Sequence, residues 1–199
     1  MPLGDRFPEV LGAARTGAPW ALEALYREFH PAVLGFLRAR APGEAEDLAS
    51  DVFVAVAEGL PRFEGDEEGF RSWLFTITYR KVGQLRRRVG RRRTDLEPPE
   101  DVGERLAPGD AESDAMAALG TQAALELIAS LPPAQAEVLL LRVVADLSVD
   151  EVARIVGRRP TAVRALQHRA VVGLAKRAGR PKNTGSGASR RGRPRQWRE

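Results

Sequence analysis

The stretch from Phe70 to Arg93 constrains the fold more than any other part of this sequence. It contains no proline, begins with closely spaced aromatic residues and ends with a run of cations. Its apolar side chains recur every three or four residues, which predicts one helix of about 20 residues, roughly 30 Å long, through Val89. Phe75 and Tyr79 fall on another side of this helix, where a core does not need them. The residues expected on the buried face are Phe70, Trp73, Leu74, Ile77 and Leu85.

Aromatic rings beside a basic segment favour a contact with single-stranded nucleic acid. The rings offer planes on which unpaired bases stack, and the cations hold phosphates. An amphipathic helix with ordinary core aromatics and a solvated basic end is the alternative explanation of the same pattern. The rest of the chain favours the nucleic-acid contact.

The charge of this 199-residue chain is segregated along the sequence. The formal net charge is only +4, but acids dominate residues 95–114 and cations dominate residues 176–199. Such asymmetry indicates a nucleic-acid partner more strongly than the net value does. A hydrophobic fraction of 43% allows one or two domains with real cores.

Several classes of function are not expected. The chain has no cysteine and two histidines, so neither disulfides nor a thiolate or histidine metal centre is predicted, and no cofactor is predicted. The acids between Glu64 and Glu68 do not have the spacing of a calcium loop. No phosphate loop and no Ser/His/Asp or Cys/His set is present, so the protein is not expected to be an enzyme. No apolar run approaches the ~18 residues of a membrane span and no signal peptide is seen, so a cytoplasmic location is expected.

A compact helical domain is predicted over residues 20–93. A helical pattern begins at Trp20, and Pro31 is expected to interrupt or kink it. A second helix over residues 45–60 has apolar residues at i, i+3, i+4, i+7 and i+8, the spacing of a core-facing stripe. A flexible acidic loop over residues 63–69 then leads into the long helix. The stripe consists of Ala45, Leu48, Ala49, Val52, Phe53, Val56 and Leu60.

The opposite face of the 45–60 helix is acidic and contains one apolar residue. A face of this kind is more often simply solvated. The alternative is that it docks a basic helix of a partner protein. It is formed by Asp47, Asp51, Val54 and Glu58.

Three segments are expected to lie outside the two domains. Residues 94–119 contain three prolines, many acids and few large apolar side chains, which is typical of a disordered linker. Residues 179–199 form a Gly-, Ser- and Pro-rich cationic tail that is expected to be disordered and either adds nonspecific affinity for DNA or is inert. Residues 1–19 are assigned to an N-terminal extension.

A second helical domain is predicted over residues 120–178. Its most apolar helix follows Pro133, a residue suited to the first helical position. Ser148 and Glu151 form a capping box that begins a short helix, and Gly157 suits the end of that helix. A longer helix follows, and this order of short helix, glycine-containing turn and longer helix is the helix–turn–helix pattern.

In a helix–turn–helix the second helix enters the major groove and its first turns touch base edges. Arginine can pair bidentately with guanine and alanine can contact a thymine methyl group. Arg158 and Arg159, in the turn, are expected to meet phosphates. Any αα-hairpin with a basic surface is the alternative. The first turns of the second helix, which runs to about Lys176, offer Thr161, Arg164, Ala165, His168 and Arg169.

Two pieces of the sequence resemble extracytoplasmic-function (ECF) sigma factors, the small promoter-recognition subunits of bacterial RNA polymerase in the sigma-70 family. AEDLASDVFVAVAEGLPRF followed by FRSWLFTITYRKVGQLRRR resembles their region 2, and LPPAQAEVLLLRVVADLSVDEVARIVGRRPTAVRALQHRA resembles their region 4. Two motifs in the right order are more specific than either alone. The resemblance implies an all-α fold: a region 2 helical bundle and a region 4 helix–turn–helix domain, joined by a flexible acidic linker.

The resemblance also implies partners. A protein of this family binds core RNA polymerase at the β′ coiled coil and the β flap, recognises the −35 element as duplex and the −10 element as an opened strand, and helps to melt the DNA. The loop over residues 63–70 would hold a base flipped out of the non-template strand, with stacking of about 1–3 kcal/mol per base. An anti-sigma factor that occludes these surfaces is a further expected partner.

Site residues carry over from the resemblance position by position. Core polymerase is expected to contact Glu46, Asp47, Leu48, Asp51, Phe53, Val54 and Glu58. The −10 DNA is expected to contact Phe63, Phe70, Trp73, Thr76, Ile77, Tyr79, Arg80, Lys81, Gln84, Arg87 and Arg88. The −35 DNA is expected to contact Arg158, Arg159, Thr161, Arg164, Ala165, His168 and Arg169.

The sequence departs from the family pattern at three positions. The family usually has Asn at Arg80, Asp at Gln84 and Arg at Ala136. Arg80 and Gln84 lie in the expected −10 recognition helix, so the −10 base preference of the family does not carry over to this chain. Ala136 removes a charge on the side of the polymerase flap or the −35 element.

The spacing of the promoter elements constrains the linker. Elements about 25 base pairs apart are separated by roughly 85 Å, whereas a 26-residue coil averages about 30 Å. The linker must therefore run extended, or the domains must supply much of the distance. The two domains are expected to be placed by polymerase and to be mobile without it.

The sequence is also compatible with two functions other than that of a sigma factor. A freestanding helix–turn–helix regulator leaves the aromatic helix around Trp73 unexplained and lacks a recognisable dimerisation element. A helical interaction protein with a basic tail requires no DNA contact. Binding to core polymerase distinguishes both from a sigma factor.

Overall fold

The computed structural model describes residues 3–94 and 123–178, with the side chains of the first range followed as far as Val89. All regular structure in these two ranges is helical, which confirms the all-α prediction. The linker expected over residues 94–119, apart from the helical Thr94, and the tail expected over residues 179–199 lie outside the described residues.

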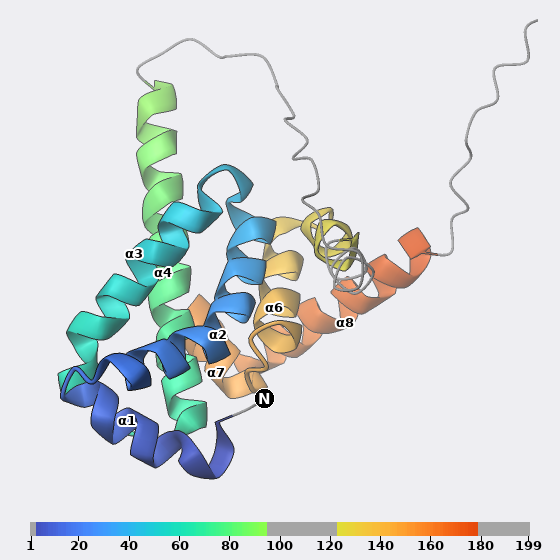
Figure 1. Cartoon of the computed structure of the whole chain (residues 1–199). Coiled ribbons are helices and arrows are strands. Elements are labelled where there is room, and N and C mark those ends of the chain that lie inside the picture. Colours follow the sequence, from blue (N-terminus) through green and yellow to red (C-terminus); the bar gives the residue numbers. More distant parts are fainter. Residues whose placement is uncertain (1–2, 95–122, 179–199) are drawn as a thin grey trace, which may run out of the picture.

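Within residues 3–94, the first domain has four α-helices and three short 3-10 helices, one before α1, one between α2 and α3 and one between α3 and α4 (Figure 1). The helices are α1 (Phe7–Arg15), α2 (Pro19–Arg40), α3 (Ala45–Gly59) and α4 (Glu67–Thr94). The 3-10 helices are η1 (Gly4–Arg6), η2 (Pro42–Glu44) and η3 (Leu60–Arg62).

Helix α1 lies in the segment that the sequence assigned to an N-terminal extension. It packs on α2 and η3 and is therefore part of the first domain. Its buried side chains have the i, i+3, i+4, i+7 spacing of an amphipathic helix, so the pattern was present in the sequence. They are Phe7, Val10, Leu11 and Ala14.

Pro31 was expected to interrupt or kink helix α2. The helix continues through Pro31, so the predicted interruption is wrong. A proline inside a helix removes one backbone hydrogen bond and costs about 3 kcal/mol. Here the proline side chain is exposed, while Phe29 and Val33 on either side of it are buried. Burial of the helix on both sides of Pro31 outweighs the local cost.

Helix α4 buries more of its circumference than its sequence predicts. The prediction that Phe75 lies away from the core is wrong: its ring is fully buried and packs edge-to-face on Phe36, with 6.0 Å between ring centroids. The cause is that α4 contacts α2, α3 and a helix of the second domain. A helix covered on several sides needs apolar residues on several sides. Tyr79, the other residue placed off the core face, is half-buried.

The second domain contains a helical stretch over residues 123–129 and the helices α6 (Pro133–Val143), α7 (Val149–Val156) and α8 (Pro160–Ala178). Its local signals behave as predicted. Glu151 N–H donates to the hydroxyl oxygen of Ser148 at 3.3 Å, and Ser148 N–H donates to the Glu151 carboxylate at 2.7 Å, which completes the capping box. Gly157 ends α7 with φ = 66°, a left-handed conformation that favours glycine.

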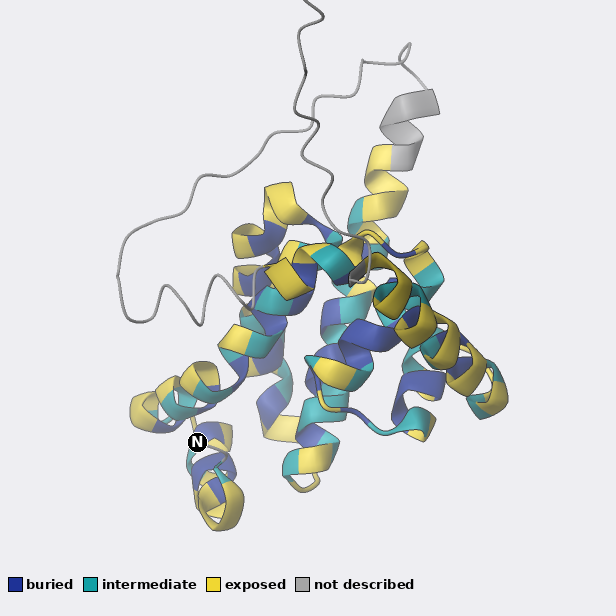
Figure 2. Ribbon diagram, turned by 90° about the vertical axis from the view of Figure 1, so that its right-hand side faces the viewer, coloured by how far each residue is buried: buried dark blue, intermediate teal, exposed yellow. Residues whose placement is uncertain are grey.

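The two domains pack against each other, α2 on α6 and α4 on α7. The buried apolar residues of both domains form a single cluster. Figure 2 colours the buried segments of the helices dark blue. The two domains were expected to be mobile relative to each other without polymerase, whereas in this structure they are in contact. This packing brings residues from the two halves of the chain into direct contact, as described below.

Candidate nucleic-acid and protein interfaces

The acidic face predicted on α3 is a real surface feature. Asp47, Asp51 and Glu58 are exposed, and Val54 between them is 59% exposed. Asp51 also forms an ion pair with Lys81 of α4, with 3.4 Å between Nζ and Oδ2. An exposed valine among carboxylates has no role in the core, so this face is available to a partner with apolar and basic groups.

Two residues expected to contact polymerase are placed differently. Leu48 is buried and belongs to the stripe that α3 turns toward the core, so it is not an exposed contact. Phe53 is half-buried, and its ring lies 4.7 Å from that of Tyr26 and 5.9 Å from that of His30, measured between centroids. Phe53 is therefore shared between the core and the surface.

An apolar groove beside Phe53 was missed by the sequence reasoning. The groove runs between α2 and α3, and Tyr26 at its edge is 43% exposed. A sequence signal for this surface is the i, i+4 pair Tyr26 and His30, whose rings stack with 4.5 Å between their centroids. The groove is lined by Leu22, Glu23, Leu25, Tyr26, Phe53, Val56, Ala57 and Leu60.

The residues expected to contact −10 DNA differ in their exposure to solvent. Phe70 is fully buried among other rings, so its expected contact with DNA is replaced by a place in the core. The exposed members of the set are Arg80, Gln84, Arg87 and Arg88, and the half-buried members are Phe63, Trp73, Thr76, Ile77, Tyr79 and Lys81. The side chains of residues 91–93, which extend the basic run, lie outside the described part of the chain.

Phe63 and Trp73 form a stacked aromatic pair at the start of α4. Their ring centroids are 5.0 Å apart with an interplanar angle of 27°, and Phe63 also meets Phe70 edge-on at 5.4 Å. The indole of Trp73 lies directly against the backbone of Gly59 at the end of α3. Because Phe63 supports Trp73, a substitution of either ring also disturbs the other.

The contact between Gly59 and Trp73 predicts a loss of stability in Gly59→Ala. A β-carbon at this position would lie 2.6 Å from Cζ2 of Trp73, so the ring must move. We expect the free energy of unfolding to fall by about 1–3 kcal/mol, measured by urea denaturation.

Gly12→Ala is the matched control, because no heavy atom lies within 4 Å of a β-carbon there and the residue is inside α1. The control should be more stable than the wild type by about 0.5–1 kcal/mol. Equal stability of the two variants would contradict the tight contact at Gly59.

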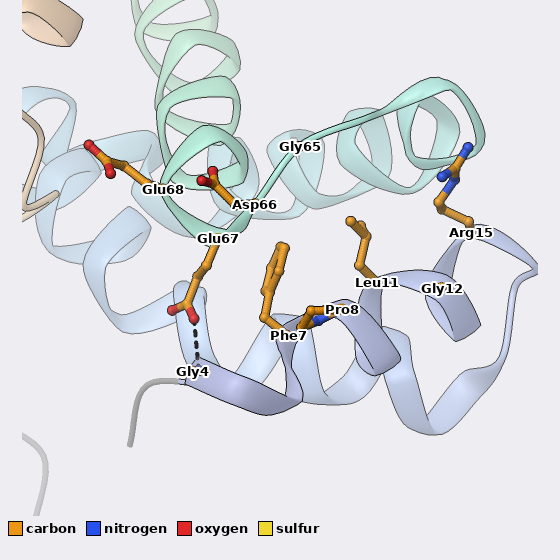
Figure 3. Close-up of a pocket in the computed structure, with 10 residues that line it drawn as sticks. All are labelled: Gly4, Phe7, Pro8, Leu11, Gly12, Arg15, Gly65, Asp66, Glu67 and Glu68. Atoms are coloured by element: carbon orange, nitrogen blue, oxygen red, sulfur yellow. Dashed lines mark hydrogen bonds between the residues drawn. The ribbon is translucent and has the colours of Figure 1, made fainter.

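The acidic residues at the start of α4 have structural partners, and Figure 3 shows the hydrogen bond between Gly4 and Glu67. Asp66 accepts a hydrogen bond from Gly69 N–H at 2.8 Å at the start of α4, and Glu67 accepts one from Gly4 N–H at 2.8 Å. Phe7 and Leu11 of α1 point toward residues 65–68 and line a hollow with them. Among residues 3–94 and 123–178, no group of three metal-ligating side chains occurs, and no helix is long and apolar enough to cross a membrane.

The helix–turn–helix presents a complete outward face. All seven residues expected to meet −35 DNA are exposed: Arg158, Arg159, Thr161, Arg164, Ala165, His168 and Arg169. The opposite side of α8 holds the helix in the domain, since Val163, Leu166 and Ala170 are buried there and Leu174 is half-buried. Ala136, at the position where the family usually has Arg, is fully buried in α6, so this position faces the core rather than a partner.

A charged cluster joins the two domains and was not foreseen from the sequence. We call it the Glu137 cluster; it consists of Arg40, Tyr79, Arg86 and Glu137. Oε1 of Glu137 lies 2.6 Å from a nitrogen of Arg40 and 2.6 Å from a nitrogen of Arg86, and Tyr79 OH donates to Oε2 at 3.4 Å. The side chains of Arg40 and Glu137 are only 7% and 14% exposed.

Burial affects the electrostatics of the Glu137 cluster. It lowers the pKa of Arg40, although the charge of Glu137 opposes this. It also raises the pKa of Tyr79, and the carboxylate of Glu137 adds to that effect. Nε of Arg40 is buried without a hydrogen-bond partner in the described part of the chain. The attraction of Glu137 therefore does not fully offset the burial of the Arg40 charge. The unpartnered Nε adds a further cost of about 1–3 kcal/mol.

Comparison with known proteins gives a consistent result for both domains. Residues 25–93 match the family "Sigma-70 region 2", and residues 121–172 match the family "Sigma-70, region 4". Over 178 residues the chain is 36% identical to the ECF RNA polymerase sigma factor ShbA of Streptomyces griseus, covering 81% of this chain and 92% of ShbA. It is 35% identical over 175 residues to the ECF RNA polymerase sigma factor SigD of Mycobacterium tuberculosis, covering 84% and 82% of the two chains.

Two solved structures share the fold. CnrH, in complex with the cytosolic domain of CnrY, has a TM-score of 0.60 and 22% identity, covering 87% of this chain and 97% of CnrH. The sigma factor RpoE of Bartonella quintana, in complex with the anti-sigma factor NepR, has a TM-score of 0.60 and 22% identity, covering 77% and 94% of the two chains. At 22% identity these comparisons establish only that the fold is shared.

Proposed function

The chain belongs to the extracytoplasmic-function family of RNA polymerase sigma factors. We therefore propose which of its surfaces bind core polymerase and which bind promoter DNA. The relatives match both domains in one chain, so a freestanding helix–turn–helix regulator is not favoured. Proteins of this family initiate transcription without catalysing a reaction of their own. We propose the same for this chain, and a place of action in the cytoplasm, where polymerase and promoter DNA are found.

The first element of the proposal is that the acidic face of α3 docks on core polymerase. The observation that carries it is Val54, 59% exposed among Asp47, Asp51 and Glu58. A basic helix such as that of the β′ coiled coil complements this face in both charge and apolarity. The groove at Tyr26 and Phe53 continues the same surface across to α2.

The second element is the contact with promoter DNA. The exposed arginines of α4, with the Phe63–Trp73 pair near its start, suit an opened −10 strand, because they combine phosphate-binding charge with rings on which bases stack. The outward face of α8 suits the duplex −35 element, because Arg164 lies in its first turns, where a recognition helix reaches base edges. The β flap is the proposed support for the second domain.

Occupying both elements at once requires the domains to separate. A single packed body of about 150 residues is roughly 40 Å across, whereas elements about 25 base pairs apart span roughly 85 Å. The packing of α2 on α6 and of α4 on α7 therefore cannot persist in a promoter complex. We propose that polymerase binding stabilises the separated arrangement.

An anti-sigma factor is the proposed regulatory partner. RpoE of Bartonella quintana is described in complex with the anti-sigma factor NepR, and the present chain shares its fold. A protein of this kind would cover the acidic face of α3 or the faces that meet DNA. Purification of the chain from a native lysate is expected to recover a second stoichiometric protein besides polymerase. Repeated recovery of polymerase alone would count against this partner.

Charge reversal on α3 tests the docking proposal. Gel filtration of the chain with purified core polymerase is expected to show co-elution of the wild type. Asp47→Arg and Asp51→Arg should weaken the complex by at least about tenfold, because each places a cation opposite a basic partner. Asp51→Arg also puts a cation beside Lys81, so Asp47→Arg, whose side chain is exposed, is the cleaner variant.

Glu9→Arg provides the matched control, since it makes the same change of charge on the exposed side of α1. It should co-elute as the wild type does. If the wild type binds duplex DNA but not core polymerase, the docking proposal is wrong. If all three variants bind equally, polymerase uses a different face.

A further inference from the structure

The contact between the two domains is built around a single carboxylate. Glu137, on α6 of the second domain, accepts ion pairs from Arg40 at the end of α2 and from Arg86 on α4, both through Oε1 at 2.6 Å. Residues far apart in the sequence thus share one partly buried oxygen. Removal of one member of such a group leaves the others with uncompensated charge.

Apolar residues also bring the two domains close on the α2 side. A β-carbon on Gly35 of α2 would lie 3.5 Å from Val144 and 3.8 Å from Leu125, both in the second domain. These are ordinary van der Waals distances, so a methyl group fits there but a larger side chain does not. A weaker ion pair between Arg71 and the exposed Asp146, at 3.8 Å, joins the domains at another point of α4.

The cluster includes groups that lie on the proposed −10 surface of α4. Tyr79 belongs to the residues expected to meet the −10 strand, and Arg86 lies in the basic run of α4. In the packed arrangement the Tyr79 hydroxyl and the Arg86 guanidinium are both bonded to Glu137. The recognition face of α8 remains exposed in the same arrangement. The packing therefore withholds part of the −10 surface and leaves the −35 surface free.

We propose that the Glu137 cluster is an autoinhibitory latch, which holds the two domains in a closed arrangement until polymerase and DNA replace it. This inference rests on the proposed function of α4 in −10 binding. In the closed arrangement Arg86 forms an ion pair with the carboxylate of Glu137. In the open arrangement a DNA phosphate takes the place of that carboxylate. When the domains separate, the arginine exchanges one anionic oxygen for another, so opening does not leave it unpaired.

The composition of the cluster suits a latch that can be released. It contains two guanidinium groups and one carboxylate, hence an excess positive charge that a phosphate can compensate. The buried Nε of Arg40 without a hydrogen-bond partner weakens the closed arrangement further. The ion pairs at 2.6 Å provide the opposing stabilisation.

Distance measurements on the full chain test the latch directly. Because the sequence has no cysteine, Glu9→Cys on α1 and Ala175→Cys on α8 provide two unique sites for a fluorescent donor and acceptor, one on each domain. Both positions are exposed and lie outside the cluster. In the absence of polymerase, Glu137→Gln is expected to shift energy transfer toward longer distances. Gly35→Leu is a second variant, in which the larger side chain is expected to push the domains apart while every charge of the cluster is retained.

Binding to a single-stranded 20-mer of mixed sequence provides an independent readout. Glu137→Gln and Gly35→Leu are both expected to bind it more tightly than the wild type, because Tyr79 and Arg86 become available. If the wild type is closed about 90% of the time, the gain is about tenfold. Binding to a duplex of the same mixed sequence should change much less, since the face of α8 is exposed in both arrangements.

Two matched controls separate the latch from general effects. Asp150→Asn removes one exposed negative charge from the same domain and should change neither energy transfer nor single-strand affinity to a comparable extent. Gly35→Ala adds only a methyl group in ordinary contact with Val144 and should stay closed. Circular dichroism checks that each variant remains folded.

The outcomes are distinct. Energy transfer that is identical in the wild type, Glu137→Gln and Gly35→Leu would overturn the latch. A shift in distance without a gain in single-strand affinity would also overturn it, because the contact would then not be inhibitory. Failure of the wild type to bind core polymerase would contradict the proposed function and not the latch. In that case the energy-transfer comparison of the variants, made without polymerase, still shows whether the cluster holds the domains together.

Discussion

Replacement of Phe75 by alanine is expected to lower the free energy of unfolding by about 3–5 kcal/mol. The ring is fully buried in the first domain and packs edge-to-face on Phe36, so alanine leaves a cavity that rigid neighbours on α2 and α4 cannot fill. Urea or guanidinium denaturation followed by circular dichroism measures the change. Val54→Ala, on the exposed face of α3, is the control and should stay within about 0.5 kcal/mol of the wild type.

This experiment also separates two roles for the aromatic residues of α4. A ring that stacks on DNA affects DNA binding and leaves stability nearly unchanged, whereas a core ring has the opposite effect. Unaltered stability of Phe75→Ala together with weaker single-strand binding would contradict the packing described above. Phe75→Leu should lose much less stability than Phe75→Ala, because it fills most of the same space.

Arg164→Ala is expected to weaken binding to a specific −35 duplex by about 1–3 kcal/mol, or roughly 5–150-fold, and to relax the sequence preference at one position. The residue is exposed in the first turns of α8, whereas the neighbouring Val163 is buried and holds the helix in place. The loss is therefore one of contact rather than of folding. The measurement is a selection of duplexes from a random library by the complex with core polymerase, followed by titration of the selected sequence.

Arg158→Ala is the informative control, because this exposed residue lies in the turn before α8, where contacts go to phosphates. It should weaken binding to all sequences about equally and reduce the dependence of affinity on salt. If Arg164→Ala behaved in this uniform manner too, Arg164 would be a phosphate contact and not a reader of bases.

Features that depend on neighbours three or four residues away could be predicted from the amino-acid sequence. The capping box of Ser148 and Glu151, the left-handed Gly157 and the start of α6 at Pro133 were predicted and are present. The exposed acidic face of α3 and the outward face of α8 follow from the same periodicity. These features are local because backbone capping and helix amphipathicity involve side chains within one or two turns of each other.

Which helix faces are covered depends on contacts between helices that are distant in the sequence. Phe75 is buried and α2 continues through Pro31 because other helices pack on those segments, and no spacing along either helix reveals how many sides will be covered. The close approach of Gly59 to Trp73 likewise joins two helices. The Glu137 cluster joins residues from both domains whose carboxylate and guanidinium groups, taken singly, resemble ordinary surface charges. Their partners are set by long-range packing, and this is why the contact that closes the molecule could be found only in three dimensions.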